Sequence, residues 1–190
     1  VLGSTVASSM WEYQEELFFA LTAFWLFGTM LYIWIITLIF YRYMFYQFSP
    51  SDLMPPYWIN MGAAAISTLA GVSLLSPLND VVFLQSIAPF LRGFSIMNWA
   101  TATWWVPMLL FLGIWRHVIK KIPLSYHPLY WGLVFPLGMY SVCTYKLALI
   151  FPRIYFLIFI SRIFFCAALV AWSITYLGFM KRLKQVIFSK

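Results

Sequence analysis

Five long apolar runs, separated by short polar segments, divide the chain. They cover about residues 17–41, 57–75, 93–115, 129–150 and 154–179. About twenty residues at 1.5 Å per residue cross the roughly 30 Å hydrocarbon layer of a bilayer. The pattern therefore predicts an all-α, polytopic membrane protein with five transmembrane helices. Residues 1–16 are expected to be the end of a preceding element and an outer loop, and residues 17–190 one membrane domain.

The polar segments between the runs carry turn-forming residues. Residues 42–56 hold two proline-containing turns, and residues 76–92 hold Pro77, Asn79-Asp80 and Pro89. We expect residues 76–92 to be a loop with a short interfacial helix that ends near Arg92. Within the third run, Pro107 predicts a kink near Thr103, since proline cannot donate to the carbonyl four residues back.

The composition agrees with a membrane protein along its whole length. Hydrophobic residues make up 64% of the chain and charged residues only 9%, against about 25% charged in soluble domains. The net charge is +7, but most basic residues flank apolar runs, which indicates membrane topology and not nucleic-acid binding. The two cysteines, Cys143 and Cys166, fall within apolar runs as packing thiols. No signal peptide is recognised, and the chain starts at Val1 and not at methionine, which suggests that it is part of a longer protein.

The flanking charges predict an orientation. With five crossings, one face carries eight basic residues: Arg42, Arg116, Lys120, Lys121, Lys181, Arg182, Lys184 and Lys190. The other face carries Glu12, Glu15, Glu16, Asp80, Arg92, Lys146 and Arg153. The positive-inside rule then places the C-terminus in the cytoplasm and the N-terminus outside, in the cell membrane.

Enzymatic chemistry has little support in the sequence. The only histidines, His117 and His127, flank one connector and suit an interfacial role. No acidic residue lies inside an apolar run, and no catalytic triad, phosphate-binding loop or metal-ligand pattern is present. We expect no enzyme activity, no metal and no cofactor.

The second and fourth runs differ from plain membrane anchors. The second contains many small residues, among them Gly62, Ala65, Ser67 and Gly71, which permit close approach of another helix or of a permeating species. The fourth contains Gly132, Pro136, Gly138, Ser141 and Thr144. Tight helix packing and pore lining both fit these positions.

Phe135 precedes the proline of the fourth run. Its ring is either a core aromatic packed on a neighbouring helix or, in a narrow path, a hydrophobic obstruction. Spacing alone favours the packed aromatic.

Three cations lie near one side of the membrane: Arg92, Lys146 and Arg162. Arg92 and Lys146 are expected at the outer ends of the third and fourth runs, as interfacial anchors or as a mouth that attracts anions. Arg162 lies inside the fifth run, where it either snorkels or pairs, or draws anions.

Three stretches carry a family resemblance: Pro56–Gly71, Ala102–His117 and Tyr130–Tyr140, the last with the pattern Trp-x-x-x-Phe-Pro. They cover the second to fourth runs. On these residues the chain resembles the voltage-dependent anion channel and tellurite-resistance/dicarboxylate transporter family, which includes the plant slow anion channels.

The resemblance implies a ten-helix fold of five inner–outer hairpins around a pore, typically in a homotrimer. This chain would be the second half, with the second and fourth runs inside. By position, Phe135 matches the phenylalanine that closes the family's pore. The implied function is transport of small anions such as chloride, nitrate, sulfite or C4-dicarboxylates. The chain departs from the family in that its second run lacks a proline, and five helices do not close a ten-helix pore. A membrane structural or interaction module without transport, or an inactive fragment, is therefore the alternative.

Overall fold

The computed structural model describes residues 2–7, 13–47, 57–77, 80–123 and 126–188. Over this part the chain is helical and has no strand, which confirms the all-α prediction. Its helices are α1 (Leu2–Ala7), α2 (Gln14–Phe45), α3 (Trp58–Leu74), α4 (Val82–Ile114), α5 (Trp131–Ile150) and α6 (Phe156–Phe188). A π-helical turn, Trp115–Ile119, prolongs α4, and a 3-10 turn, Pro128–Tyr130, precedes α5.

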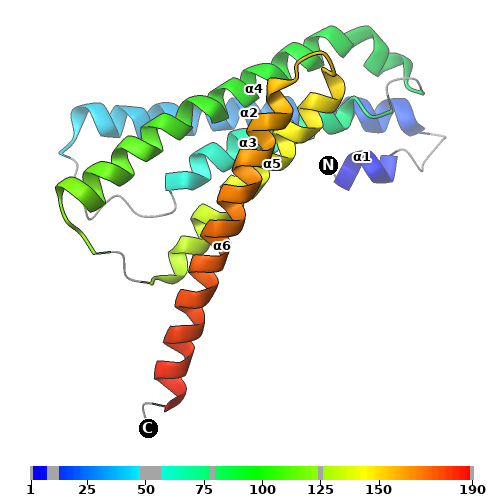
Figure 1. Ribbon diagram of the computed structural model, residues 1–190. Helices are drawn as coiled ribbons and strands as arrows, with labels where there is room; N and C mark the ends of the chain where they lie inside the picture. The colour runs from blue at the N-terminus through cyan, green and yellow to red at the C-terminus, as the bar shows by residue number, and fades with distance from the viewer. Residues whose placement is uncertain (1, 8–12, 48–56, 78–79, 124–125, 189–190) are drawn as a thin grey trace.

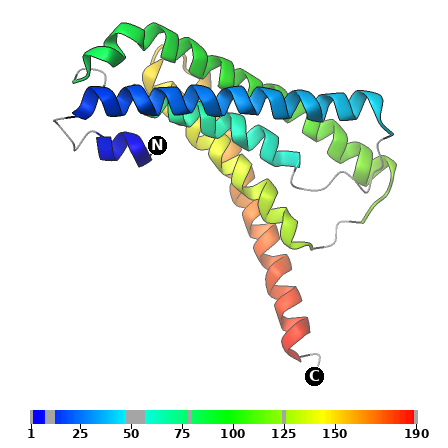
Figure 2. The same ribbon diagram turned by 180° about the vertical axis from the view of Figure 1, so that it is seen from behind.

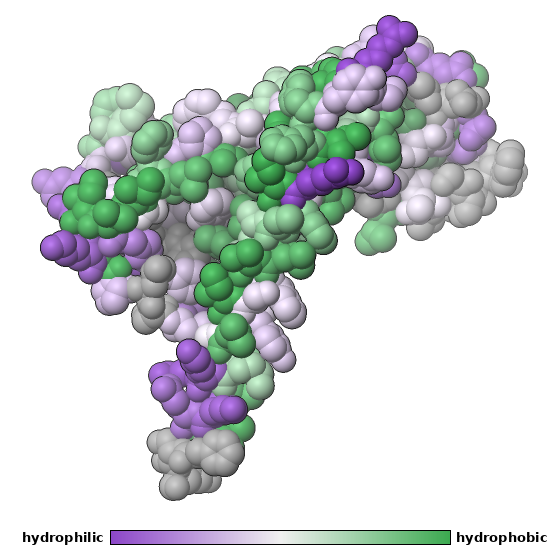
Figure 3. Space-filling model, in the orientation of Figure 1, coloured by the Kyte–Doolittle hydropathy of each residue, from purple (hydrophilic) through white to green (hydrophobic). Residues whose placement is uncertain are grey.

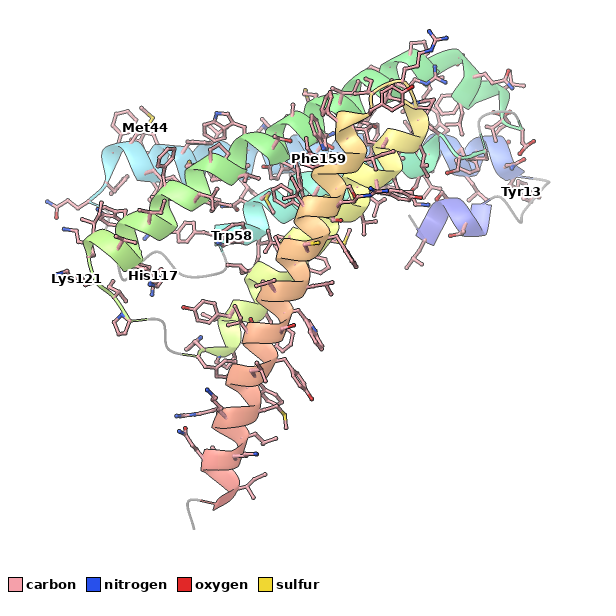
Figure 4. All side chains as sticks on the ribbon, viewed as in Figure 1. Tyr13, Met44, Trp58, His117, Lys121 and Phe159 are labelled. Carbon is pink, nitrogen blue, oxygen red and sulfur yellow. The ribbon has the colours of Figure 1, made fainter. Side chains whose placement is uncertain are left out.

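The helices form a three-helix layer crossed by a hairpin (Figures 1 and 2). Helices α2 and α4 run in the same direction, and α3 returns and contacts both. Tyr13 marks one end of this layer, while Met44 and Lys121 lie at the other (Figure 4). The α5–α6 hairpin crosses the layer, and the C-terminal half of α6 extends beyond the other helices.

Among the described residues, four helical segments are long and apolar enough to cross a membrane: Gln14–Phe45, Val82–Ile119, Pro128–Ile150 and Phe156–Ile187. Helix α3 coincides with the second predicted run but has only 17 residues, or about 25 Å. Nine of those residues are buried within the chain. Hydrophilic residues gather mainly towards the ends of the elements, and hydrophobic surface lies between them (Figure 3). The protein is therefore a multi-pass membrane protein.

The start of α4 corrects the sequence prediction. Residues 82–92, expected to be a loop with a short helix, belong to one continuous helix that reaches Ile114. Arg92 therefore lies within α4 and not at the end of a span, although its side chain is exposed. Pro89 does not end the helix.

A single buried stripe explains why α4 continues through two prolines. Its buried residues recur every three or four positions: Leu84, Ala88, Leu91, Ser95, Asn98, Ala102, Trp105 and Leu109. That spacing keeps them on one helical face. Pro89 and Pro107 are both exposed, off this stripe, so the hydrogen bonds they remove do not interrupt the packed face.

Three buried threonine hydroxyls form hydrogen bonds within their own helices. Thr22 Oγ1 donates to the Phe18 carbonyl at 2.8 Å, and Thr29 Oγ1 to the Trp25 carbonyl at 3.0 Å. Thr68 Oγ1 does the same towards Ala64, at 2.9 Å. Bonds to the preceding turn let these polar side chains sit in apolar surroundings.

Glu15 of α2 caps the N-terminus of α4. Its two carboxylate oxygens accept from the backbone N–H groups of Val82 at 2.8 Å and Phe83 at 3.0 Å. These are among the helix donors that lack a partner inside the helix. The carboxylate also lies where the helix dipole favours negative charge. The contact ties the starts of α2 and α4 together.

Replacing Glu15 by alanine should cost about 1 kcal/mol of stability, the usual value of a side-chain cap. Thermal unfolding of the purified protein in detergent measures the loss. Glu16→Ala is the matched control, because it removes the same charge from the next position. Equal losses in both variants would show that charge alone, and not the cap, is responsible.

Candidate functional site

Helices α3 and α5 cross where Gly62 meets Pro136. A side-chain Cβ at Gly62 would lie 3.0 Å from Pro136 Cγ and 3.1 Å from Pro136 Cβ. Both residues are buried. The proline ring therefore lies directly against the backbone of α3, a close approach that the small residue permits. This contact joins two of the predicted site residues, one from each predicted inner helix.

Helix α5 is the most enclosed of the four long spans. Its most apolar window is 44% buried, against 17% for α4 and α6 and 11% for α2. Its neighbour α3 is about half buried. The two helices that the sequence predicts to be inside are thus the two most covered by other helices.

One face of α5 nevertheless stays uncovered. The α5 stripe comprises Phe135, Gly138, Val142, Tyr145 and Leu149, with Lys146 beside it; Gly138 is half-buried and the others are exposed. Their spacing of three and four residues places them on one side of the helix. A Cβ at Gly138 would meet nothing within 4 Å. Phe135 is 55% exposed, whereas the adjacent Pro136 and Leu137 are buried.

Helix α3 has a shorter uncovered stripe. The α3 stripe comprises Ile59 and Ile66, which are exposed, and Ala63, which is half-buried between them. The buried residues of α3 include Gly62, Ala65 and Gly71.

The covered face of α5 carries a polar network with α4. Trp99 Nε1 donates to Thr144 Oγ1 at 2.9 Å, and Thr144 Oγ1 donates to the Tyr140 carbonyl at 2.7 Å. Thr103 Oγ1 donates to the Trp99 carbonyl at 2.8 Å. Because that hydroxyl proton is used, the Tyr140 hydroxyl is the donor in its 2.6 Å bond with Thr103 Oγ1. The network fixes the rotation of α5, and thereby the direction of the α5 stripe.

A reciprocal pair of hydrogen bonds joins α5 to α6. Ser141 Oγ donates to the Ser161 carbonyl and Ser161 Oγ donates to the Ser141 carbonyl, both at 2.9 Å. Both serines are buried. Small residues let the two backbones approach closely enough for this exchange.

The remaining small residues of α3 also lie at helix contacts. The Ser67 carbonyl accepts from Trp25 Nε1 at 2.8 Å, and Ser67 Oγ donates to the Ala63 carbonyl at 3.0 Å. Gly71 faces the Trp25 ring of α2 and Ser95 Oγ of α4, and a Cβ there would overlap both. Ala65 is fully buried in a cluster with Met61 and other core residues. Gly132, at the start of α5, is half-buried.

The three predicted cations lie on three different helices. Arg92 is on α4, Lys146 on α5 and Arg162 on α6, and all three side chains are exposed. The end of α5 packs near the first half of α4, because Ile150 contacts the cluster that contains Leu84 and Leu91. Arg92 and Lys146 therefore belong to the same end of the molecule.

The sequence did not predict which residues contact the small and hydroxyl residues of α3 and α5. Trp25, Ser95, Trp99 and Ser161 hold the small and hydroxyl residues of α3 and α5 in place. Each lies on another helix, so no local pattern links them. The period of three and four along α5 is the signal that would have identified the uncovered stripe.

The part of the chain that the structure describes contains no candidate metal-binding site. No group of three or more His, Cys, Asp or Glu side chains gathers there. Cys143 is buried and Cys166 exposed, and both are free thiols.

Relatives of the chain are membrane proteins and transporters. An uncharacterized membrane protein of Mycobacterium tuberculosis is 35% identical over 157 residues, which cover 83% of this chain and 79% of that protein. An uncharacterized transporter of Methanocaldococcus jannaschii is 28% identical over 152 residues, covering 80% of this chain and 43% of that protein. The matched part thus spans less than half of the archaeal relative. No solved structure matches the chain significantly.

A family model described as voltage-dependent anion channel matches residues 1–180. The match extends over every helix from α1 to α5 and over most of α6. It includes the α3–α5 crossing and the α5 stripe. The chain belongs to the voltage-dependent anion channel family, a family of membrane transport proteins.

Proposed function

We propose that this chain forms part of a transmembrane pathway for small anions, with the α5 stripe along the pathway and Phe135 as its gate. The observation that carries the proposal is the uncovered stripe on α5. Outer helices expose side chains to lipid as a matter of course. Here the span most covered by its neighbours keeps one face free.

Phe135 fits the role of a gate because its ring lies on the uncovered face of α5, while contacts of neighbouring residues fix the position of the helix backbone. Pro136 next to it lies against Gly62, and the Trp99–Thr144–Tyr140 bonds secure the helix two turns further on. A phenyl ring in a narrow path is a hydrophobic constriction that excludes hydrated ions until it moves. Nearly one helical turn beyond it, Gly138 leaves room for such a movement.

The charged residues near the α5 stripe suit anions that bind weakly. Lys146 lies beside the α5 stripe, and neither α3 nor α5 contains an acidic residue. One cation near the mouth raises the local anion concentration without creating a deep binding site. Arg92 and Arg162 add positive charge on the neighbouring helices. Chloride, nitrate, sulfite and C4-dicarboxylates are the substrates that this arrangement and the family resemblance favour.

The pathway requires more helices than this chain supplies. We infer that the uncovered stripes of α3 and α5 face the other half of a ten-helix pore, in a trimer of such pores. Of the small residues, Gly138 is the one on the stripe; Gly62, Gly71, Ser141 and Thr144 support its walls from the helix contacts. We place the protein in the cell membrane with its C-terminus in the cytoplasm, as the flanking basic residues favour.

Replacing Phe135 by alanine should raise anion flux. Lowering a barrier by about 1.4 kcal/mol already raises a rate about tenfold, and removal of the ring should reach at least that factor. The measurement is chloride and nitrate flux in liposomes that contain the purified protein together with the other half of the pore. Phe159→Ala is the matched control, because Phe159 is also exposed but lies on α6.

Unchanged flux in Phe135→Ala, with the protein folded, would contradict the gate. If neither the wild type nor the variant conducts in liposomes that contain all ten helices of the pore, the alternative holds. The chain is then a membrane interaction module whose uncovered stripes only pack against other helices.

A further inference from the structure

A hollow lies next to the Phe135 end of the α5 stripe, where the chain that leads into α5 meets the C-terminal half of α6. It has a volume of about 330 Å³ and lies between the segment that leads into α5 and the C-terminal half of α6. The residues that line it are Tyr126, Tyr130, Ile174, Thr175, Leu177, Gly178 and Lys181. This volume is at the lower end of the range for small-molecule sites.

The hollow depends on a close contact between Tyr126 and Gly178. A Cβ at Gly178 would lie 2.7 Å from Tyr126 Cδ2. The absence of a side chain at Gly178 therefore lets the tyrosine ring rest on the helix. Tyr126 also packs beside Phe179, with ring centroids 6.4 Å apart. The segment before α5 is thus held away from α6 by one ring, and the hollow opens beside it.

The length of α6 places this hollow at the membrane surface. A crossing that starts at Phe156 needs about twenty residues, so it ends near Thr175. The helix continues well beyond that point and projects past the other helices (Figure 1). Ile174 and Leu177 then lie at the acyl-chain boundary, and Lys181 lies among the headgroups. Tyr126 and Tyr130 match the interfacial preference of tyrosine.

The charge around the hollow is of one sign. Lys181 lines it, and Arg182 and Lys184 follow on the same helix. All five acidic residues of the sequence precede residue 81. Glu15, one of the acidic residues in the described part, is engaged at the start of α4, remote from the end of α6 (Figure 1). Among the residues that the structure describes, the lining of the hollow contains a cation and no carboxylate, so a phosphate group here would meet Lys181.

We propose that this hollow binds one anionic phospholipid. Its phosphate lies against the Lys181 ammonium, and the first part of an acyl chain lies along Ile174 and Leu177. Basic pockets between membrane helices at the headgroup level recognise anionic lipids in this way. Tyr126 and Tyr130 close the site on the side of α5.

Native mass spectrometry of the detergent-purified protein tests this with equimolar phosphatidylglycerol and phosphatidylcholine. The wild type should retain phosphatidylglycerol in preference. Lys181→Gln should lower that preference about fivefold, the contribution of one basic residue at an anionic surface. Lys184→Gln, which removes the same charge from a residue outside the hollow, should leave it nearly unchanged. Gly178→Ala should weaken retention of phosphatidylglycerol at unchanged charge, because it displaces Tyr126.

Three results would overturn the proposal. The first is equal retention of the two lipids by the wild type. The second is an equal effect of Lys181→Gln and Lys184→Gln, which would indicate general attraction to a basic surface. The third is displacement of the lipid by excess glycerol phosphate, which would indicate a site for soluble phosphates. Elution volume and circular dichroism establish that each variant is folded.

Discussion

Trp105→Ala should destabilise the protein by about 3–5 kcal/mol, the range for truncating a buried tryptophan or phenylalanine. Trp105 is fully buried at the centre of the contact between α2, α3 and α4. Its indole Nε1 donates to the Tyr32 hydroxyl at 3.1 Å, and that hydroxyl donates to the Asn60 carbonyl at 3.3 Å. The ring of Phe40 lies 5.2 Å away. The substitution removes these contacts and leaves a cavity among three helices.

Trp104→Ala is the control for this experiment. The neighbouring indole is 52% exposed, so the same truncation one position earlier should cost much less. Unfolding by increasing SDS in mixed micelles, followed by circular dichroism, measures both variants against the wild type. Comparable losses at the two positions would contradict the assignment of Trp105 to the core of the bundle.

The sequence predicted the helices well wherever apolar content alone decided them. The predicted 57–75 run ends within one residue of α3 at each side, and 129–150 coincides closely with α5. At α4 the polar residues and Pro89 between positions 81 and 92 concealed a helix. The regular spacing of Leu84, Ala88 and Leu91 was the better indicator. Their burial against α2 stabilises the first turns of α4, which hydropathy alone assigns to a loop.

The candidate site was less predictable because its roles depend on which helices meet. Gly62 and Gly71 look alike in the sequence. In the structure one lies against Pro136 of α5, and the other against Trp25 and Ser95. Gly138 looks like both of them but is uncovered. A pattern along one helix shows where small residues recur, and only the neighbouring helices decide whether each is a contact or an opening.

This difference between glycines predicts a second substitution with a large effect on stability. Gly71→Ala should destabilise the protein by about 1–3 kcal/mol, the usual cost of overpacking a filled contact. The new methyl group would overlap Ser95 Oγ and the Trp25 ring. The indole cannot simply rotate away, because its Nε1 is bonded to the Ser67 carbonyl at 2.8 Å. Helices α2 and α4 therefore have to move apart from α3.

Gly138→Ala supplies the matched comparison on α5. A methyl group there meets nothing within 4 Å, and alanine favours a helix by up to about 1 kcal/mol over glycine. We expect Gly138→Ala to be neutral or slightly stabilising in the same SDS titration in which Gly71→Ala unfolds early. If Gly71→Ala is as stable as the wild type, the close meeting of α2, α3 and α4 at this glycine is wrong. If Gly138→Ala is the more damaging of the two, the α5 stripe is not open at that position, and the pathway proposed along it loses its main support.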